Sequence, residues 1–428
     1  MKYLRKFMNI NYIQTIILKA LPRSLRYRVV RAGIKINFQP DKRLTFKLAT
    51  TKEELSAAFK LLHDAYVGEG YMKPHPSGMR ITIYHALPGT STLIALFDNK
   101  VIGTVSIIRR TGMGLPLETI FNTSHVVKNS IKCAEISALA THKDFRKQRG
   151  EILFPLLKFL YEYCTKYFGI DLMLIAVNPK GIDYYKALLS FKDLQSKEVS
   201  NYSYVNGAPA AGAYLFLDDA YKELNFLFNH KKNEKNLFKF FLEVNLPNFH
   251  FPERKYHTTC DPVMSPELLR YFFIEQSTIF NFLTKKEYIT LKKLYNHKQY
   301  SDILPEYRLN PQVTGQRLTR YAVNCPGVLY VDDQKNIRMK VVNVSKNGLG
   351  AFIDEAVILS NHIKAKIEIA EFEIIDLKLK PVWKDDEKTY YGFALLEDNL
   401  EWSNFLQYIE KRFLMMNTAT FRTYRNIA

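Results

Sequence analysis

The order of apolar segments between residues 45 and 220 is the feature that most constrains the fold of this 428-residue chain. The short apolar stretch CAEISALA (133–140) is followed by the long helical pattern EILFPLLKFLYEYCTKYF (151–168) and by the buried-strand pattern DLMLIAV (171–177). A further helix is expected from about Ile182 to Leu189. Such alternation of strands and helices predicts an α/β or α+β domain with a mixed sheet.

Turn and capping signals extend this pattern on both sides. The segment TKEELSAAFKLLHDAY begins with Thr51 and has Glu54 three residues later, which is the pattern of a helix capping box. The segment STLIALFDNKVIGTVSII predicts a hairpin that turns at Asp98-Asn99. SKEVSNYSYV and AAGAYLFL predict a second hairpin around Asn206-Gly207, which closes the domain.

The C-terminal third has a different pattern. Residues 220–308 are mostly helical, with a loop at LPNFHFPERKYHTTCDP. Six short strands follow from residue 316, and a helix is expected from about Leu400 to Phe413, which together predict a small β-barrel. The chain is therefore expected to be an α+β multidomain protein. Its predicted parts are a basic segment (1–44), a mixed-sheet domain (45–220), a helical connector (221–313), a barrel domain (314–412) and a tail (413–428).

The positive charge is unevenly distributed along the chain. The formal net charge is +19, and residues 1–50 contain 12 Lys or Arg but only one acidic residue, Asp41. A nucleic-acid polymer is therefore not expected as a partner, because most of the excess lies in one short segment. Basic and apolar residues alternate in that segment at helical spacing, a pattern typical of binding to an anionic membrane surface. A helix packed on the next domain with solvated charges is the alternative.

The cysteines and the hydropathy favour the cytoplasm. Cys133, Cys164, Cys260 and Cys325 lie far apart and form no C-x-x-C pair, so neither a disulfide framework nor a cysteine metal site is predicted. No metal is expected. The chain contains no run of about 18 apolar residues. We therefore expect a cytoplasmic protein, located at the inner face of the membrane if the basic segment binds lipid.

Several motifs together resemble a known family of acyltransferases. They are AEISALATH (134–142), FRKQRGEILFPLL (145–157), VNPKGIDYYKALLSF (177–191), EGY (69–71), YHALPGT (84–90) and GLP (114–116). Residues 45–220 thereby resemble the GNAT acyltransferase fold and, within it, the bacterial FeeM-type N-acyl amino acid synthases, which are relatives of the acyl-homoserine lactone synthases. The resemblance implies formation of an amide from an acyl thioester and an amine.

Amide formation needs a base, a site for the thioester oxygen and a proton for the departing sulfur. Glu135 is the only carboxylate in segment 133–140, where burial would raise its pKa and make it a general base. A solvent-facing Glu135 is the alternative. Backbone N–H groups near Leu139, Ala140 and Thr141 are candidates for an oxyanion hole. The resemblance implies that Tyr185 protonates the leaving sulfur, and an aromatic core residue is the alternative.

The identity of the acyl donor is inferred from a difference between this sequence and the usual motif of the superfamily. Acyl-CoA transferases of the superfamily usually carry Q/R-x-x-G-x-G/A, whose amides hold the pyrophosphate. Here Gln148 is followed by Glu151 and Leu153 at the two glycine positions. This favours an acyl-phosphopantetheine on an acidic acyl carrier protein over acyl-CoA. The candidate donor-binding residues are Thr141, Lys143, Arg146, Lys147, Arg149 and Asn178. A solvated basic turn is the alternative for the cluster, and no other catalytic cofactor is expected.

Differences from the related sequences also indicate which molecule accepts the acyl group. Homoserine lactone synthases tend to carry E-I-S-R, whereas Ala138 stands at the arginine position here, so a lactone product is not expected. Gly181 and Ser190 stand where FeeM-like sequences often have His and Gly. The expected acceptor is the amine of an amino acid or a related amine.

The barrel segment resembles a PilZ domain, a family that binds cyclic di-GMP. The resemblance rests on NVSKNG (343–348), on GQRLTRYAV (315–323) upstream and on VW and YGFALL downstream. It implies a nucleotide site made by Arg317, Arg320, Asn343, Ser345 and Gly348. The family's arginines are usually R-x-x-x-R, whereas Arg317 and Arg320 are three apart. A degenerate PilZ domain that serves for docking is the alternative.

The sequence thus predicts an N-acyltransferase that moves a long-chain acyl group from acyl carrier protein to an amine and is regulated by cyclic di-GMP. One alternative is a non-catalytic cyclic di-GMP effector whose transferase fold binds an acyl group or a partner. Another is a small-molecule acetyltransferase that uses acetyl-CoA, against which the missing glycines argue.

Overall fold

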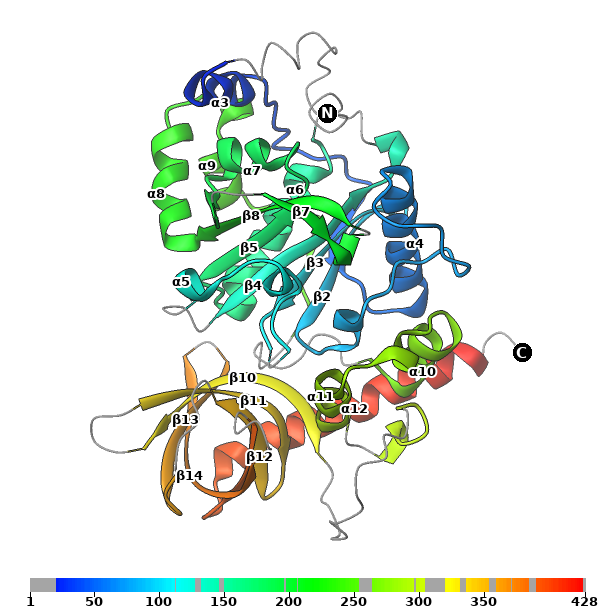
Figure 1. Cartoon of the computed structure of the whole chain (residues 1–428), viewed down its shortest axis with the longest axis vertical. Helices are drawn as coiled ribbons and strands as arrows, with labels where there is room; N and C mark the ends of the chain where they lie inside the picture. Colours follow the sequence, from blue (N-terminus) through cyan, green and yellow to red (C-terminus); the bar gives the residue numbers. More distant parts are fainter. Residues whose placement is uncertain are drawn as a thin grey trace. The chain divides into compact units, whose positions relative to one another are not determined.

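Two compact units make up the computed structural model of the chain (Figure 1). The first contains the residues up to Arg80, Ser91–Arg110 and Gly114–Glu253, and the second contains Ile81–Thr90, Thr111–Met113 and the residues from Arg254. The structure describes residues 21–425 except 112, 128–131, 146–149, 196–197, 206, 254–263, 296–297, 305–319, 332–335, 354–358, 371 and 385–389.

A nine-stranded mixed sheet forms the centre of the first unit, in the order β6-β8-β5-β4-β3-β2-β1-β9 with β7 paired to β8. Strands β4 and β5, and β1 and β9, run parallel, whereas β1–β2, β3–β4 and β5–β8 are antiparallel. The mixed sheet is therefore confirmed. The strands are β1 Leu44–Leu48, β2 Thr90–Phe97, β3 Lys100–Arg109, β4 Cys133–Thr141, β5 Leu172–Val177, β6 Lys192–Asp193, β7 Val199–Tyr202, β8 Ala208–Phe216 and β9 Phe249–His250.

Local sequence signals explain the elements that flank the sheet. The hydroxyl of Thr51 and the carboxylate of Glu54 form the expected capping box at the start of its helix. Asp98 and Asn99 both have positive φ, 46° and 61°, as a two-residue hairpin turn with right-handed twist requires. The helices are α3 Arg23–Ala32, α4 Lys52–Gly68, α5 Ser124–Val127, α6 Leu153–Glu162, α7 Ile182–Leu189, α8 Leu217–Phe228 and α9 Leu237–Leu242.

Helix α6 supplies much of the core of this unit. Its apolar residues pack with those of β1–β5 and β8, and Phe159 is fully buried. A π-helical turn, Tyr163–Tyr167, continues α6 to nearly the end of the predicted helix. Strand β9 lies in the segment that the sequence predicts to be a loop. Its two residues are too few to produce a periodic signal. It adds to the edge of β1, where Phe46 pairs with Phe249.

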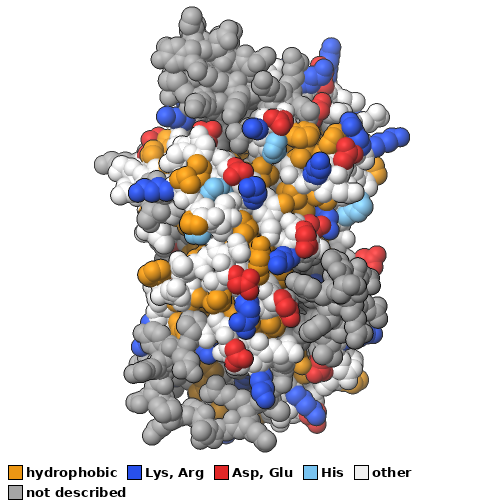
Figure 2. Space-filling model, turned by 90° about the vertical axis from the view of Figure 1, so that its right-hand side faces the viewer, with side chains coloured by type: hydrophobic (Ala, Val, Ile, Leu, Met, Phe, Trp, Pro, Cys, Tyr) orange, Lys and Arg blue, Asp and Glu red, His pale blue; other side chains and the backbone are white. Residues whose placement is uncertain are grey.

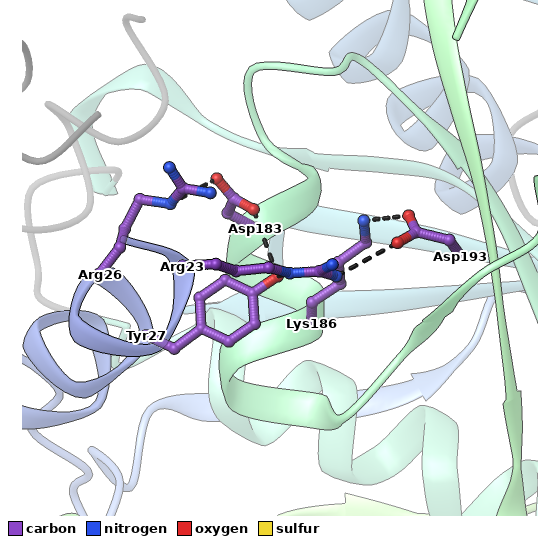
Figure 3. A network of polar contacts seen from close by, with 6 residues as sticks. All are labelled: Arg23, Arg26, Tyr27, Asp183, Lys186 and Asp193. Atoms are coloured by element: carbon purple, nitrogen blue, oxygen red, sulfur yellow. Dashed lines mark hydrogen bonds and ion pairs between the residues drawn. The ribbon is translucent and has the colours of Figure 1, made fainter. Parts of the chain in front are cut away.

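Two basic side chains of α3 are bound to acidic side chains near α7. Arg26 lies 3.1 Å from a carboxylate oxygen of Asp183, and Arg23 lies 3.2 Å from one of Asp193. For this stretch the packed-helix alternative is thus supported, while the rest of the predicted membrane segment, residues 1–20, lies outside the described residues. Figure 3 shows the network, which consists of Arg23, Arg26, Tyr27, Asp183, Lys186 and Asp193.

The second unit contains a closed six-stranded barrel in the order β10-β11-β12-β15-β14-β13, as predicted. The helix that follows it, α12, runs from Leu400 to Arg425 and is longer than expected. Trp402 of α12 is 1% exposed and belongs to the barrel core. The strands are β10 Tyr321–Tyr330, β11 Asn336–Ser345, β12 Gly348–Ile353, β13 Ile363–Ala370, β14 Glu373–Lys384 and β15 Tyr390–Leu395, and the helices before them include α10 Pro266–Arg270 and α11 Lys285–Leu294.

Three further predictions concern the whole chain. None of its described helices is long and apolar enough to cross a bilayer. Cys133, Cys164 and Cys325 are buried free thiols, and Cys260 lies outside the described residues. On the face drawn in Figure 2, the described basic side chains are interspersed with acidic ones.

Candidate functional sites

Glu135 lies in β4, an interior strand of the sheet, and its side chain is 2% exposed. The alternative of a solvent-facing residue is therefore wrong. The backbone N–H of Leu117 donates a hydrogen bond of 2.8 Å to Oε2. Burial, and to a smaller extent the nearby charge of Glu118, raise the pKa of Glu135 to about 8, although the Leu117 hydrogen bond opposes this. Its carboxyl group can exchange a proton near neutral pH.

Leu117, which contacts Glu135, belongs to the turn that begins with the GLP segment (114–116). Glu118 fixes this turn by accepting hydrogen bonds from the Leu115 N–H (2.8 Å), the Arg110 Nε (2.9 Å) and the Thr123 hydroxyl (2.8 Å). Gly114 has a φ of +79°, and a Cβ there would lie 2.7 Å from a Glu118 carboxylate oxygen. The glycine therefore allows the turn to close against Glu118 and to present Leu117 to β4.

Strands β4 and β5 separate directly after Glu135. Their pairing within the described residues covers Cys133–Glu135 opposite Leu172–Leu174. On its other edge, β4 has a bulge, because Ser137 pairs with Ser106 and Ala140 pairs with Thr104. The extra residue is accommodated at Ala138, whose φ is +56°. The predicted oxyanion residues therefore lie where the sheet opens.

The three predicted oxyanion donors do not point the same way. The N–H of His142 donates to the Ile102 carbonyl of β3 at 2.7 Å. Because successive N–H groups of a strand point to opposite edges, the N–H of Thr141 points to the β5 side and that of Ala140 points to β3. Ala140 is thus placed unsuitably, whereas Thr141 and the bulged Leu139 remain candidates.

Tyr185, the predicted proton donor, lies on α7 and packs partly buried against the core of the sheet. Burial, assisted by Tyr66, raises the pKa of Tyr185 to about 12. Tyr66 itself, on α4, packs against the cluster that contains Ala138 and Ala140. Tyr66 therefore lies between the Tyr185 side chain and the bulge of β4.

Sequence reasoning missed the aromatic cluster around Tyr66. The ring centroids of Tyr66 and Tyr71 are 5.8 Å apart, and Tyr71 hydrogen-bonds Asn178, the residue after β5. The guanidinium carbon of Arg80 lies 4.4 Å from the centroid of Tyr66 and 4.8 Å from that of Tyr204. Tyr71 belongs to the EGY motif, but no local pattern links it to Asn178 or Arg80.

The predicted donor-binding residues are only partly described. Lys143 is exposed, Thr141 and Asn178 are half-buried, and Arg146, Lys147 and Arg149 lie outside the described residues. At the glycine positions of the pyrophosphate motif, Glu151 is exposed and Leu153 is buried as the first residue of α6. These two side chains stand where the usual motif has glycines whose backbone N–H groups bind a pyrophosphate at the start of the helix.

Asn343 is the centre of the second candidate site, on the barrel. It is 2% exposed and accepts a hydrogen bond of 2.7 Å from Arg320. Its amide donates to the Lys293 carbonyl at 2.9 Å and to the Tyr390 hydroxyl at 2.7 Å. The structure thus brings Arg320 and Asn343 together, as the nucleotide-site prediction requires. It also gives Asn343 three protein partners.

An aromatic box holds Lys293 of α11 beside Asn343. The ammonium lies 3.5 Å from the ring centroid of Tyr390 and 5.8 Å from those of Phe352 and Trp383. Rings at these distances stabilise a cation. No local sequence pattern indicates this contact, since α11 and the three rings lie far apart along the chain.

Ser345 and Gly348 form the turn between β11 and β12. The Ser345 hydroxyl donates to the Gly348 carbonyl at 3.1 Å, and the Ser345 carbonyl accepts from the Trp402 indole N–H at 3.2 Å. A Cβ at Gly348 would collide with the Phe393 carbonyl oxygen, so this position requires glycine. Arg317 lies outside the described residues. No cluster of potential metal ligands occurs in the described parts of either unit.

Residues 57–215 match the family model described as N-acyl amino acid synthase FeeM. A search among curated proteins gives no match.

Three solved structures are similar to parts of the chain. FeeM from uncultured soil microbes is 24% identical over 42% of this chain and 94% of its own, with a TM-score of 0.35. The CoA-dependent acyl-homoserine lactone synthase BjaI with MTA is 16% identical over 50% of this chain and 96% of its own, with a TM-score of 0.37. YcgR from Escherichia coli, in complex with c-di-GMP, is 11% identical over 27% of this chain and 52% of its own, with a TM-score of 0.21. The family model confirms the predicted resemblance to the FeeM-type N-acyl amino acid synthases for residues 57–215, which run from α4 to β8.

Proposed function

We propose that the chain is an N-acyltransferase that moves a long-chain acyl group from a thioester to the amine of an amino acid or a related amine. The observation that carries the proposal is the position of Glu135, a buried carboxyl group at the point where β4 and β5 separate. The match of residues 57–215 to the N-acyl amino acid synthase model supports it.

In the proposed reaction, Glu135 removes a proton from the acceptor's ammonium, directly or through water. The amine lone pair attacks the thioester carbonyl, a C–N bond forms, and the C–S bond breaks when the tetrahedral intermediate collapses. The N–H groups of Leu139 and Thr141 stabilise the negative oxygen of that intermediate. The sulfur leaves as a thiolate and takes up, directly or through water, the proton that the nitrogen loses as the amide forms. Glu135 returns its own proton to solvent, so the products are an amide and a free thiol.

Tyr185 supports the departure of the sulfur by hydrogen bonding in this scheme. Its pKa of about 12 makes it a weaker acid than an alkyl thiol, whose pKa is about 8.5. A complete proton transfer from the phenol to the thiolate is therefore unfavourable. A hydrogen bond from the phenol avoids this cost, because the proton stays on the phenol. We expect Tyr185→Phe to slow the reaction less than a change at Glu135.

The donor in our proposal is acyl carrier protein. Glu151 and Leu153 occupy the positions where a pyrophosphate would need glycine, so CoA has no cradle at the start of α6. A single phosphopantetheine phosphate needs fewer backbone N–H groups than a pyrophosphate does. An acidic carrier is attracted by basic groups such as Lys143. BjaI is described as CoA-dependent, which makes acyl-CoA the competing donor to test.

The test compares palmitoyl-acyl carrier protein with palmitoyl-CoA, each incubated with the full chain and the twenty common amino acids. Mass spectrometry of the extract should show N-acyl amino acids, formed faster from the carrier protein. Glu135→Gln should lower kcat/KM about 10²- to 10⁴-fold, whereas Glu223→Gln, at an exposed position of α8, should leave it unchanged. Absence of any amide with both donors would refute the enzyme and favour a non-catalytic binding protein.

We also propose that the barrel binds cyclic di-GMP and that binding changes the acylation rate. The contact between Arg320 and Asn343 supports this, since an arginine next to a buried amide can hold a phosphate beside a guanine edge. The contacts of Asn343 to Lys293 and Tyr390 must then be exchanged for contacts to the nucleotide. Calorimetric titration of wild type and Arg320→Ala tests the site, and no saturable binding at about micromolar nucleotide would remove it.

A further inference from the structure

Arg80 is a buried cation of the first unit that has no acidic partner in the described part of the chain. The residue is 9% exposed, and no carboxylate of the described residues lies within ion-pair distance of its guanidinium. Its one hydrogen bond among those residues runs from Nη2 to the Tyr204 carbonyl, at 2.9 Å. A guanidinium stays protonated and has five N–H donors, so four of them are open to a further acceptor.

Two aromatic rings hold the Arg80 guanidinium in place. It lies over the rings of Tyr66 and Tyr204, at 4.4 and 4.8 Å from their centroids, and the backbone N–H of Arg80 donates to the Phe59 carbonyl of α4 at 3.0 Å. The rings offset part of the cost of removing the charge from water, but they accept no strong hydrogen bonds. A positioned fork of donors without an anion is the form of a site for a carboxylate or a phosphate.

This site adjoins the proposed reaction centre through one side chain. Tyr66, which contacts the Arg80 guanidinium, packs against the cluster of Ala138 and Ala140 at the β4 bulge. It also lies close enough to Tyr185 to raise the pKa of that phenol. A small molecule anchored at Arg80 is therefore held beside the opening between β4 and β5.

We propose that Arg80 binds the carboxylate of the acceptor, and hence that the acceptor is an α-amino acid and not a simple amine. The inference rests on the proposed N-acyl transfer. In an α-amino acid the amine is one carbon from the carboxylate, so the anchor fixes where the nucleophilic nitrogen lies. A phosphate of the donor is the other anion that the same donors could hold. We favour the carboxylate because Arg80 is placed by α4 and by the segment before β8, not by the basic turn before α6 where the donor phosphate is expected.

The test uses three pairs of acceptors that differ only in the carboxylate: tyrosine and tyramine, phenylalanine and phenethylamine, leucine and isoamylamine. For each pair the ratio of kcat/KM for the amino acid to that for the amine is measured with palmitoyl-acyl carrier protein. We expect wild type to favour the amino acid. Arg80→Met should reduce the ratio about 100-fold, with the KM of the donor unchanged, and Arg80→Lys should reduce it less, because the ammonium keeps the charge without the fork.

Arg43→Met is the matched control. Arg43 also lies over an aromatic ring, that of Phe97 at 4.3 Å, but it is exposed and paired with Asp41. Its replacement should leave the ratio unchanged. The ratio is independent of the fraction of folded enzyme, so it can be read from Arg80→Lys even if Arg80→Met folds poorly.

The outcomes separate the two proposals. An unchanged ratio in Arg80→Met and Arg80→Lys overturns the carboxylate site while amide formation stands. A rise in the KM of the donor with an unchanged ratio assigns Arg80 to the phosphate and also overturns it. If wild type acylates no amino acid and no amine with either donor, the proposed function fails and the inference fails with it.

Discussion

Glu135 shows how a single residue can be prepared for chemistry by its surroundings. It stands in an interior strand, it receives one backbone hydrogen bond from Leu117, and Glu118 adds a negative charge nearby. Desolvation and like charge both disfavour the carboxylate, whereas the hydrogen bond favours it, and the first two effects prevail. A carboxyl group in this condition is protonated at low pH and becomes a base only near pH 8.

The rate should therefore rise with pH. Below the pKa of about 8, kcat/KM is expected to increase close to tenfold per pH unit and then to level off, because only the ionised form of Glu135 accepts a proton. The measurement is kcat/KM from about pH 6 to about pH 9.5 for wild type and Glu135→Gln. The variant should lose the break near pH 8 and rise only with deprotonation of the acceptor's own ammonium, and a wild-type profile without that break would contradict the assignment.

Stability should respond to pH in the opposite direction. The native pKa of Glu135 is raised, so its carboxyl is protonated in the native state and ionised in the unfolded chain between about 4.5 and about 8. The unfolded state then binds fewer protons, and the free energy of unfolding falls through this window by at most about 1.4 kcal/mol per pH unit. Glu135→Gln should be more stable than wild type at pH 8 and similar to it at pH 4.5 by denaturant titration. Parallel curves for the two proteins would count against the raised pKa.

At the scale of elements, α7 positions Tyr185, a candidate catalytic residue, against the core of the sheet. The helix carries Tyr185, receives Arg26 of α3 at Asp183, and ends at Ser190 in the left-handed conformation, with a φ of 61°. The Ser190 hydroxyl oxygen is buried without a hydrogen-bond partner among the described residues. Both features cost stability, and glycine, which FeeM-like sequences often have here, would remove both.

Ser190→Gly should consequently stabilise the first unit. Glycine adopts the left-handed conformation without the Cβ penalty, and the unsatisfied hydroxyl is lost, so a gain of about 1 kcal/mol is expected. Ser24→Gly, at an exposed position of α3, is the control and should destabilise slightly through helix propensity. A lower unfolding free energy for Ser190→Gly would show that the hydroxyl has a partner in solution.

The two candidate sites of the whole molecule lie in separate compact units. The first carries Glu135 and the matched family region, and the second carries the barrel with Arg320 and Asn343. Regulation of one by a ligand of the other requires a difference in ligand affinity between two states of the chain. In the second unit, the contact of Lys293 with Asn343 and Tyr390 is an element that a nucleotide would have to rearrange.

Cyclic di-GMP should change the acylation rate of the full chain. The expected coupling is about 5- to 150-fold, the usual range for allosteric ligands. Arg320→Ala should abolish the response while leaving the nucleotide-free rate intact, because Arg320 belongs to the barrel unit. A rate that saturating nucleotide leaves unchanged, in a protein that binds it, would show that the units act independently.

The features that could be predicted from the sequence are those that depend on residues close together along the chain. The periodicity of segments 133–140, 151–168 and 171–177 predicted the strand–helix–strand core, and the scarcity of carboxylates in β4 singled out Glu135. It missed Arg80 because its partner Tyr204 lies 124 residues away.

Contacts of this kind depend on the tertiary fold. The same reason applies to the aromatic box around Lys293, which three strands of the barrel build. The orientation of the Ala140 N–H toward β3 followed from the register of the bulge, which no local pattern indicates.

The placement of the two tryptophans has an optical consequence. Trp383 and Trp402 are the only tryptophans of the chain, and both belong to the barrel unit. Indole emission therefore reports the second unit and carries no signal from the nine-stranded sheet of the first. Trp402, 1% exposed, should emit at shorter wavelength than Trp383, which is 43% exposed and faces Lys293. Selective excitation of indole thus follows one half of the molecule in the intact, unlabelled chain, while tyrosine emission follows both.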